Sequence, residues 1–214
     1  MLYASLNNEK IEAVPKARAI CPLCEKEVFS KCGEINVWHW AHIQDKSCDN
    51  WHEPETVWHK DWKNLFGIEL SEIIITKNGK KHIADIRTKE NVVIELQNSS
   101  ISKSVIRKRE MFYGERMLWV VNGINFKANF NLIPEHRFFK VSQGLVHKRT
   151  GQLLKHGEKL FIWKWCIKSW NEVQRPIFID FGEENLLWIK DGMGSSICRG
   201  KYISKKEFLD KYLK

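Results

Sequence analysis

The sequence predicts an α/β (α+β) fold in which helices and strands alternate, and two observations carry this prediction. Segments with helical and strand-like periodicity alternate between residues 51 and 124. The segment ahead of them is rich in Cys and His and lacks long periodic stretches. We therefore expect that it needs a stabilising cross-link, here called a staple, in order to fold. We therefore expect three parts: a stapled N-terminal module over 1–50, an α/β core over 51–124, and an aromatic-rich, β-rich region over 125–214 that ends in a helix.

The elements of the predicted core follow one another closely. EPETVWHKDWKNLF predicts a helix that begins near Pro54, and ISKSVIRKREMFYGE predicts a second helix that ends at Gly114. Between them, residues 67–88 predict a hairpin that turns at Asn78-Gly79, and ENVVIELQNS predicts the next strand. MLWVVNG then predicts a buried strand after the second helix.

The last ninety residues predict strands and a closing helix. KLFIWKWCIKSW and PIFIDF are strand-like, and SKKEFLDKYLK predicts a helix in which Ser204 and Glu207 fit a capping box. The chain has ten tryptophans, many of them in this region. We interpret them as core side chains, since aromatic residues bury readily, with a protein interface as the alternative.

Charge favours a polyanionic partner. The chain has 35 Lys and Arg against 26 Asp and Glu, a formal net charge of +9. Such an excess indicates nucleic acid first, although basic surfaces also serve solubility alone. No apolar run approaches the roughly 18 residues of a membrane span. The first residues show no basic flank followed by an apolar stretch, so we expect no secretion signal and a cytoplasmic location.

Clustered cysteines indicate a metal site near the start of the chain, because disulfides are rare in the cytoplasm. Cys21 and Cys24 form a CxxC pair whose thiolates can share one tetrahedral ion. A second pair is expected from His39, His42 and Cys48. Four of these five residues are the expected ligands of a structural zinc ion in a zinc-ribbon-like module, and the pattern leaves open which four. A CxxC pair without a metal, or as a redox pair, is the alternative.

One acidic side chain is expected on the buried face of the first helix. On a helical wheel, Glu55 falls inside the apolar arc and Glu53 falls opposite to it. A bare charge aimed at a sheet is costly, which marks Glu55 as a candidate functional residue. The arc is formed by Trp58, Trp62, Leu65 and Phe66.

Two further acids interrupt the predicted strands. Asp85 has apolar neighbours in the hairpin, and Glu95 and Gln97, two residues apart in the next strand, point to the same face. Clustered carboxylates repel one another unless a cation lies among them, and their hard oxygen atoms suit Mg²⁺. Metal-assisted phosphodiester hydrolysis is therefore expected. Ordinary salt bridges are the alternative for any one acid, with the candidate partners Arg87, Lys81, Lys103 and Arg109.

The ordered set of motifs resembles one family. CPLC, then HWAH, then ETVWHKDWK, then ADI and IELQ are similar to the competence protein CoiA-like nucleases of the PD-(D/E)XK superfamily. The resemblance covers about residues 20–122. It implies a restriction-endonuclease-like core, with a mixed sheet flanked by helices, and DNA as substrate, in DNA uptake, repair or defence. The family's acidic residues fall on Glu55, Asp85 and Glu95, and its third-strand polar residue falls on Gln97, where the superfamily's commonest residue is lysine.

The residues and the resemblance together lead to a hypothesis about the roles of single residues. Asp85 and Glu95, with the Leu96 carbonyl, are expected to hold Mg²⁺ or Mn²⁺, while Glu55 binds or tunes the same ion. Gln97 is expected to position the attacking water, and His59 to orient Glu55 or contact phosphate. The side chains expected to contact DNA are Lys60, Lys63, Lys81, Lys103, Arg109 and Tyr113. The rival hypothesis is a non-catalytic, zinc-containing DNA-binding or adaptor protein.

Overall fold

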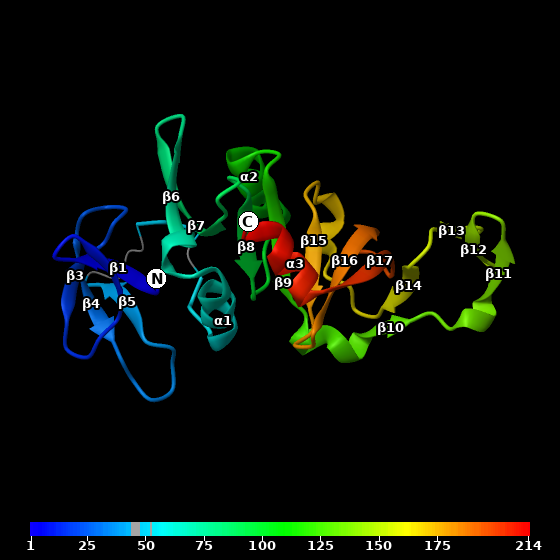
Figure 1. The fold of residues 1–214 in the computed structure, drawn as a ribbon, viewed down its shortest axis with the longest axis horizontal. Coiled ribbons are helices and arrows are strands. Elements are labelled where there is room, and N and C mark those ends of the chain that lie inside the picture. The colour runs from blue at the N-terminus through cyan, green and yellow to red at the C-terminus, as the bar shows by residue number, and fades with distance from the viewer. Residues whose placement is uncertain (44–47, 52) are drawn as a thin grey trace. The chain divides into compact units, whose positions relative to one another are not determined.

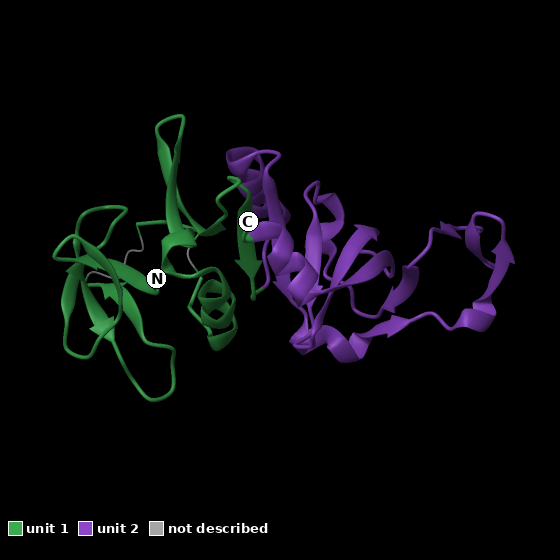
Figure 2. Cartoon of the chain, in the orientation of Figure 1, with its two compact units in different colours: residues 1–99, 213–214 green, residues 100–212 purple. Residues whose placement is uncertain are grey.

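The computed structural model describes residues 1–43, 48–51 and 53–214 (Figure 1). The chain forms two compact units, each considered by itself below (Figure 2). Unit 1 comprises Met1–Ser99 with Leu213–Lys214, and unit 2 comprises Ser100–Tyr212. The division falls inside the 51–124 segment that the sequence predicts as one core.

Unit 1 begins with a five-stranded antiparallel sheet in the order β2-β1-β3-β4-β5. The turn between its first two strands is made by Asn7 and Asn8, whose positive φ angles of 53° and 67° asparagine tolerates well. Its core surrounds Trp40 and Val28, against which Ile74 and Ile83 of the following hairpin pack. The strands are β1 Tyr3–Leu6, β2 Glu9–Glu12, β3 Arg18–Ile20, β4 Glu27–Lys31 and β5 His39–His42.

Helix α1 (Val57–Phe66) starts later than the sequence predicts. The Thr56 hydroxyl accepts a hydrogen bond from the His59 N–H and caps the helix, so Glu55 precedes α1 and does not lie on its face. The expected apolar arc is also corrected. Leu65 is 46% exposed, and the buried side of α1 carries Lys63 and His59 beside Trp62 and Phe66.

The predicted hairpin is confirmed. Strands β6 (Ser71–Lys77) and β7 (Lys80–Arg87) pair antiparallel, and Asn78 and Gly79 between them have φ angles of 51° and 71°. Positive φ at both positions is the signature of a type I′ turn, which Asn-Gly favours. Strand β8 (Val93–Gln97) pairs antiparallel with β7, with Arg87 opposite Val93.

Unit 2 is built on a mixed sheet. Strands β9 and β15 run parallel, and the sheet continues antiparallel through β16, β17, β14 and β10. The bounds are β9 Met117–Asn122, β10 Phe130–Leu132, β14 Glu158–Trp163, β15 Ile177–Asp180, β16 Asn185–Asp191 and β17 Ile197–Ser204. A small antiparallel sheet is formed by β11 Phe138–Val141, β12 Gly144–His147 and β13 Leu153–Leu154.

Two helices complete unit 2, and both confirm predicted caps. Helix α2 (Lys103–Tyr113) ends at Gly114, whose φ is 84°. Helix α3 (Lys205–Tyr212) begins after Ser204, whose hydroxyl accepts from the Glu207 N–H. Short 3₁₀ turns in the chain are η1 Ile68–Leu70, η2 Ile124–Asn129, η3 Glu135–Arg137 and η4 Lys168–Glu172.

Three tryptophans of unit 2 lie in its core, as the sequence predicts: Trp119, Trp163 and Trp170. Trp119 and Trp170 meet edge to face at 5.3 Å, and Phe178 meets Phe208 of α3 at 5.0 Å. Trp165 is the contrary case, because it is 85% exposed. Among the described residues, no helix has the length and apolarity needed to cross a membrane.

Two glycines provide a matched test of how tightly unit 2 is packed. A Cβ added at Gly194 (φ 80°) would lie 2.7 Å from the Asn171 nitrogen, whereas one at Gly151 (φ 68°) would meet nothing within 4 Å. Both substitutions to alanine incur left-handed backbone strain of about 1–2 kcal/mol. We expect Gly194→Ala to lower the free energy of unfolding by about 1–3 kcal/mol more than Gly151→Ala, because only Gly194→Ala overpacks. Denaturant unfolding measures both, and equal losses would contradict this packing.

Candidate functional site

The first candidate site is a cluster of sulfur and nitrogen atoms in the N-terminal sheet of unit 1. The ligand atoms of Cys21, Cys24, His42 and Cys48 all lie within 4.8 Å of one another. Cys21 Sγ is 3.6 Å from Cys48 Sγ, and Cys24 Sγ is 3.3 Å from His42 Nε2. In a tetrahedral zinc site with Zn–S bonds of about 2.3 Å, neighbouring sulfurs lie about 3.8 Å apart. Both the donor types and their spacing therefore fit a structural zinc ion.

The positions of these atoms also show which of the five predicted ligands belong to the cluster. His39 is not part of the cluster, and its Nδ1 lies 2.8 Å from the Val37 carbonyl oxygen. His39 and His42 are three residues apart on one strand, β5, so their side chains point to opposite faces. Burial raises the pKa of the Cys21 and Cys48 thiols. A divalent cation offsets this effect, since it binds the thiolate form.

The second candidate site surrounds a buried lysine that the sequence analysis assigned to the DNA-contacting surface. The side chain of Lys63 is 1% exposed and therefore cannot contact DNA. Its ammonium lies 3.0 and 3.2 Å from the two Glu55 oxygens, 2.9 Å from Glu72 Oε1 and 3.3 Å from Asp85 Oδ1. We call these four residues the Lys63 cluster. It joins α1 to β6 and β7 through charge-assisted contacts.

Glu72 is the member of this cluster that sequence reasoning missed. Its two carboxylate oxygens accept hydrogen bonds from the backbone N–H groups of Leu2 and Tyr3, at 2.7 and 3.0 Å. Glu72 also has a positive φ of 48° at the start of β6. Neither the backbone conformation nor a partner seventy residues away has a local sequence signal.

The pKa values of Lys63, Glu72 and Glu55 are strongly shifted by their surroundings. Burial opposes the charge on Lys63, but Glu72, Glu55 and Asp85 outweigh it, and the pKa of Lys63 lies well above its ordinary value. Burial also disfavours ionised Glu72, yet Lys63 and the backbone N–H donors hold its pKa far below the ordinary range. For Glu55, burial dominates over the attraction of Lys63 and raises its pKa from 4.5 to about 7.

Asp85 and Glu95 lie on the same face of the β7–β8 pair. Arg87 stands opposite Val93, and every second residue from these two points the same way, which places Asp85, Glu95 and Gln97 together on that face. Asp85 Oδ2 accepts a hydrogen bond from the Leu96 N–H at 2.9 Å. Lys63 and Leu96 thus orient the two oxygens of Asp85, while Glu95 is only 2% exposed.

Gln97 pairs with Glu53, which the helical wheel places away from the site. Gln97 Nε2 donates to Glu53 Oε1 and to the Ser99 carbonyl oxygen, the latter at 3.1 Å. Within the described residues, Gln97 Oε1 and Glu53 Oε2 are buried and have no hydrogen-bond partner. The amide nitrogen of Gln97 is therefore engaged, and its oxygen remains as an acceptor.

His59 is fixed between α1 and β8. Its Nδ1 lies 2.9 Å from the Thr56 hydroxyl and its Nε2 lies 3.3 Å from the Leu96 carbonyl oxygen. Burial lowers the pKa of His59, although the nearby Asp85 works in the opposite direction. In the neutral ring, Nε2 donates to Leu96 and Nδ1 accepts from Thr56. His59 thus contacts the strand beside Glu95, and its two ring nitrogens are occupied by Thr56 and Leu96.

The structure does not bring the three predicted magnesium ligands to one point. Across residues 1–43, 48–51 and 53–214, the Cys and His cluster is the one set of at least three such ligand atoms within 4.8 Å. Glu55, Asp85 and Glu95 do not form a second set, because Lys63 takes up Glu55 and one oxygen of Asp85.

The remaining predicted DNA contacts are divided between the two units. In unit 1, Lys81 is exposed and Lys60 is partly exposed, with an ion pair to Glu12 at 2.8 Å. In unit 2, Lys103 is exposed and Tyr113 is half-buried. Arg109 is corrected, because it is buried and its guanidinium lies 5.9 Å from the centre of the Trp119 ring.

Zinc content tests the four-ligand assignment. We expect the wild-type chain to carry one zinc ion, and His42→Ala to lose most of it and several kcal/mol of stability, because binding energy at a structural site is folding energy. His39→Ala is the matched control and should retain the metal. Atomic emission on the purified variants, with thermal unfolding, gives both readings. Loss of zinc from His39→Ala but not from His42→Ala would overturn the assignment.

The raised pKa of Glu55 predicts a pH dependence. A carboxyl group that ionises near 4.5 when unfolded and near 7 when folded binds its proton more tightly in the folded state. Its contribution to stability is present at low pH and lost as the pH rises through 7. Relative to Glu55→Gln, the wild type should therefore lose up to a few kcal/mol of unfolding free energy between pH 5 and 8. Urea unfolding without added magnesium measures this, and a constant difference would contradict it.

Part of unit 1 matches a known protein family. Residues 3–50 match the family described as "Competence protein CoiA, N-terminal domain", a segment that contains all four residues of the Cys and His cluster. The chain is 29% identical over 117 residues to a "Competence protein CoiA" of Bacillus subtilis (strain 168). The match covers 50% of the chain and 31% of that relative, so the chain spans about a third of the relative's length. No solved structure matches the chain. Half of the chain is therefore similar to a competence protein CoiA, and residues 3–50 match the N-terminal domain of that family.

Proposed function

We propose that the chain is a metal-dependent DNA nuclease whose acidic site lies in unit 1. The observation that carries this proposal is the placement of Asp85, Glu95 and Gln97 on one face of two adjacent strands, with both oxygens of Asp85 oriented by neighbours. Buried acids with fixed geometry are more common at functional sites than elsewhere. The net charge of +9 suits a polyanionic substrate.

The donor set fits a divalent cation with two protein carboxylates. Mg²⁺ commonly binds through one or two carboxylates and keeps several waters. Asp85 and Glu95, with the Leu96 carbonyl, would hold Mg²⁺ or Mn²⁺, and the ion when bound lowers the pKa of a water molecule. Glu55 is engaged by Lys63, so we assign it to support of Asp85 and not to the metal.

The side chains around this pair have separate tasks. Lys63 and the Leu96 N–H hold Asp85 in one orientation, and neutral His59 holds the Leu96 carbonyl. Gln97 offers a buried acceptor oxygen, which can take a hydrogen bond from the attacking water and aim its lone pair. The zinc module and surface residues such as Lys81 would contact the DNA backbone without reading sequence.

One observation favours a second candidate function. Lys63 already neutralises part of the acidic cluster, so the carboxylates are stable without a metal ion. In this alternative, the chain is a non-catalytic, zinc-containing DNA-binding or adaptor protein, and the acids serve only to hold α1 on β6 and β7.

Cleavage assays with isosteric variants separate the two. We expect Asp85→Asn and Glu95→Gln to fold, keep zinc and bind DNA, while Mg²⁺-dependent cleavage falls by about 100-fold or more, since each removes a ligand charge. Asp61→Asn and Glu69→Gln, at exposed positions, are the matched controls and should cleave normally.

Calorimetry with Mn²⁺ on the same proteins gives a second reading. Binding by the wild type but not by Asp85→Asn supports the nuclease. DNA binding without cleavage and without Mn²⁺ binding would reject it in favour of the adaptor.

A further inference from the structure

The small antiparallel sheet of unit 2, β11–β13, lies in a stretch of chain whose Asp, Glu, Lys and Arg residues are all basic. Residues 136–157 contain five Lys and Arg and no Asp or Glu. All five side chains are exposed, and none forms an ion pair within the part of the chain that the structure describes. Such a concentration of cations favours a polyanionic partner. The five are Arg137, Lys140, Lys148, Arg149 and Lys155.

One face of this sheet is buried. Phe138 of β11 and Leu145 of β12 pack against the cluster of Ile133, Leu154 and Leu160. Leu145 is directly opposite Leu154 of β13, and directly opposed residues of antiparallel strands point to the same face. The sheet is therefore held in place from this side before any ligand binds.

The other face carries a row of apolar side chains that remains accessible. Phe139 is opposite Val146, and Val146 is opposite Leu153, so these three side chains lie next to one another across the sheet. Since successive residues of a strand alternate, the row points away from the face that holds Phe138. Phe139 is 48% exposed, and Val141, two residues further along β11 on the same face, is 38% exposed.

Two of the cations adjoin one end of this row. Arg137 directly precedes β11 and Lys148 directly follows β12, and the Lys148 N–H donates to the Arg137 carbonyl oxygen at 2.8 Å. The Cα atoms of Arg137 and Phe139 are at most about 7 Å apart, because only two residue steps separate them. A positive charge and an exposed aromatic ring therefore lie within reach of the same ligand.

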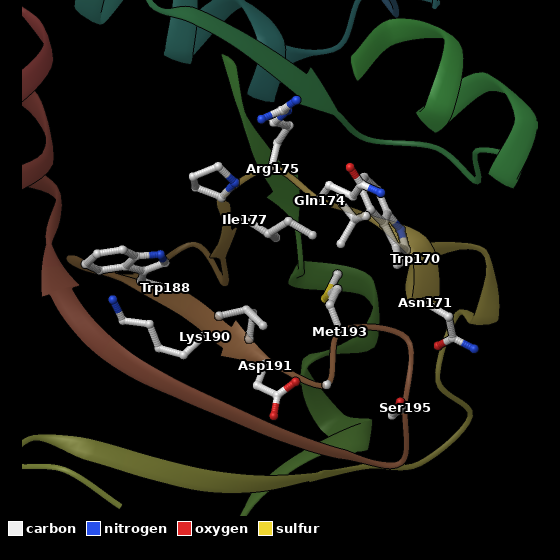
Figure 3. Close-up of a pocket in the computed structure, with 14 residues that line it drawn as sticks. Trp170, Asn171, Gln174, Arg175, Ile177, Trp188, Lys190, Asp191, Met193 and Ser195 are labelled. Carbon is white, nitrogen blue, oxygen red and sulfur yellow. The ribbon is translucent and has the colours of Figure 1, made fainter. Parts of the chain in front are cut away.

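A cavity of about 490 Å³ elsewhere in unit 2 lacks this convergence (Figure 3). Arg175 and Lys190 lie at opposite edges of the cavity, and the Arg175 guanidinium is directed away from it. On the small sheet, by contrast, Arg137 and Lys148 lie side by side.

We propose that the accessible face of β11–β13 binds a single-stranded nucleic acid. An unpaired base stacks on the Phe139 ring, beside Val146, and the neighbouring phosphates contact Arg137 and Lys148. A duplex keeps the faces of its bases inside its own stack, so stacking on an exposed ring selects an unpaired strand. The surface lies in unit 2 and shares no residue with the acidic site of unit 1, so it does not depend on the nuclease activity.

Fluorescence anisotropy on the full chain, without added magnesium, tests this surface with a labelled oligothymidylate of about 16 nucleotides. We expect Phe139→Ala to weaken binding about tenfold or more, because the stacked base loses its ring. Phe139→Tyr should retain binding and Phe139→Leu should lose it, since only an aromatic ring stacks. Ile124→Ala, at a similarly exposed apolar position of unit 2, is the matched control and should bind normally.

Two other ligands of the same length separate stacking from charge. A duplex should bind wild type and Phe139→Ala equally, because its bases are already stacked. An abasic strand, which keeps the phosphates without the bases, should bind wild type more weakly than oligothymidylate does and should be insensitive to Phe139→Ala.

The salt dependence of oligothymidylate binding tests the two cations. Arg137→Ala and Lys148→Ala should each reduce the slope of log K against log salt by about 0.7, the value for one phosphate contact on a single strand. Lys108→Ala and Lys201→Ala, at exposed positions elsewhere in unit 2, are the matched controls and should leave the slope unchanged.

A second copy of the chain is the competing occupant of this apolar face. A dimer seen by sedimentation without nucleic acid, and dissociated by Phe139→Ala, would overturn the proposal. So would equal affinities of wild type and Phe139→Ala for oligothymidylate when the variant folds normally by circular dichroism. Asp85→Asn should leave single-strand binding unchanged, so failure of this proposal and failure of the nuclease proposal are distinguishable.

Discussion

The buried ammonium of Lys63 is the interaction on which unit 1 depends. A charge removed from water is unfavourable unless it is paired and hydrogen-bonded, and Lys63 meets three carboxylates within 3.3 Å. Those carboxylates come from the segment before α1, from β6 and from β7, and Glu72 extends the network to the N–H groups of Leu2 and Tyr3 in the first sheet. One cation therefore fixes the position of α1 against two structural layers. Its removal would leave buried negative charges facing one another, which is more destabilising than loss of a surface ion pair.

The pairing of Asp85 with Lys63 also affects the chemistry proposed for Asp85. An acid that must hold a cation works best when its oxygens are fixed beforehand, because no reorganisation is then needed during reaction. Lys63 and the Leu96 N–H provide that fixation from two directions. The arrangement also places a permanent positive charge near the acids in a chain whose third-strand position is Gln97, which cannot carry charge.

The fold elements can be predicted from local sequence patterns, whereas the positions of the side chains in the candidate sites depend on tertiary contacts. Asn78-Gly79 specifies its own turn, and CxxC specifies its own knuckle, so both were predictable from a few residues. The helical wheel misplaces Glu53, because it extends α1 past the Thr56 cap into a segment that is not helical. Only strand β5 distinguishes His39 from His42, because their side chains point to opposite faces of it. The role of Glu72 rests on backbone donors seventy residues away, which no local pattern encodes.

The two candidate sites of unit 1 are physically joined through strand β7. Asp49 directly follows the zinc-cluster residue Cys48, and its carboxylate accepts from the Ile83 N–H at 2.8 Å and lies 2.9 Å from His82 Nδ1. The Trp51 ring stacks on His82 at 3.4 Å. These contacts hold β7 in place at His82 and Ile83, and Ile83 lies two residues before Asp85. Asp85 is itself oriented by Lys63. A metal ion bound at Cys48 would therefore also help to order the strand that carries Asp85. The N-terminal module is thus linked to the strand of Asp85 through the peptide bond between Cys48 and Asp49 and the contacts of Asp49 with β7.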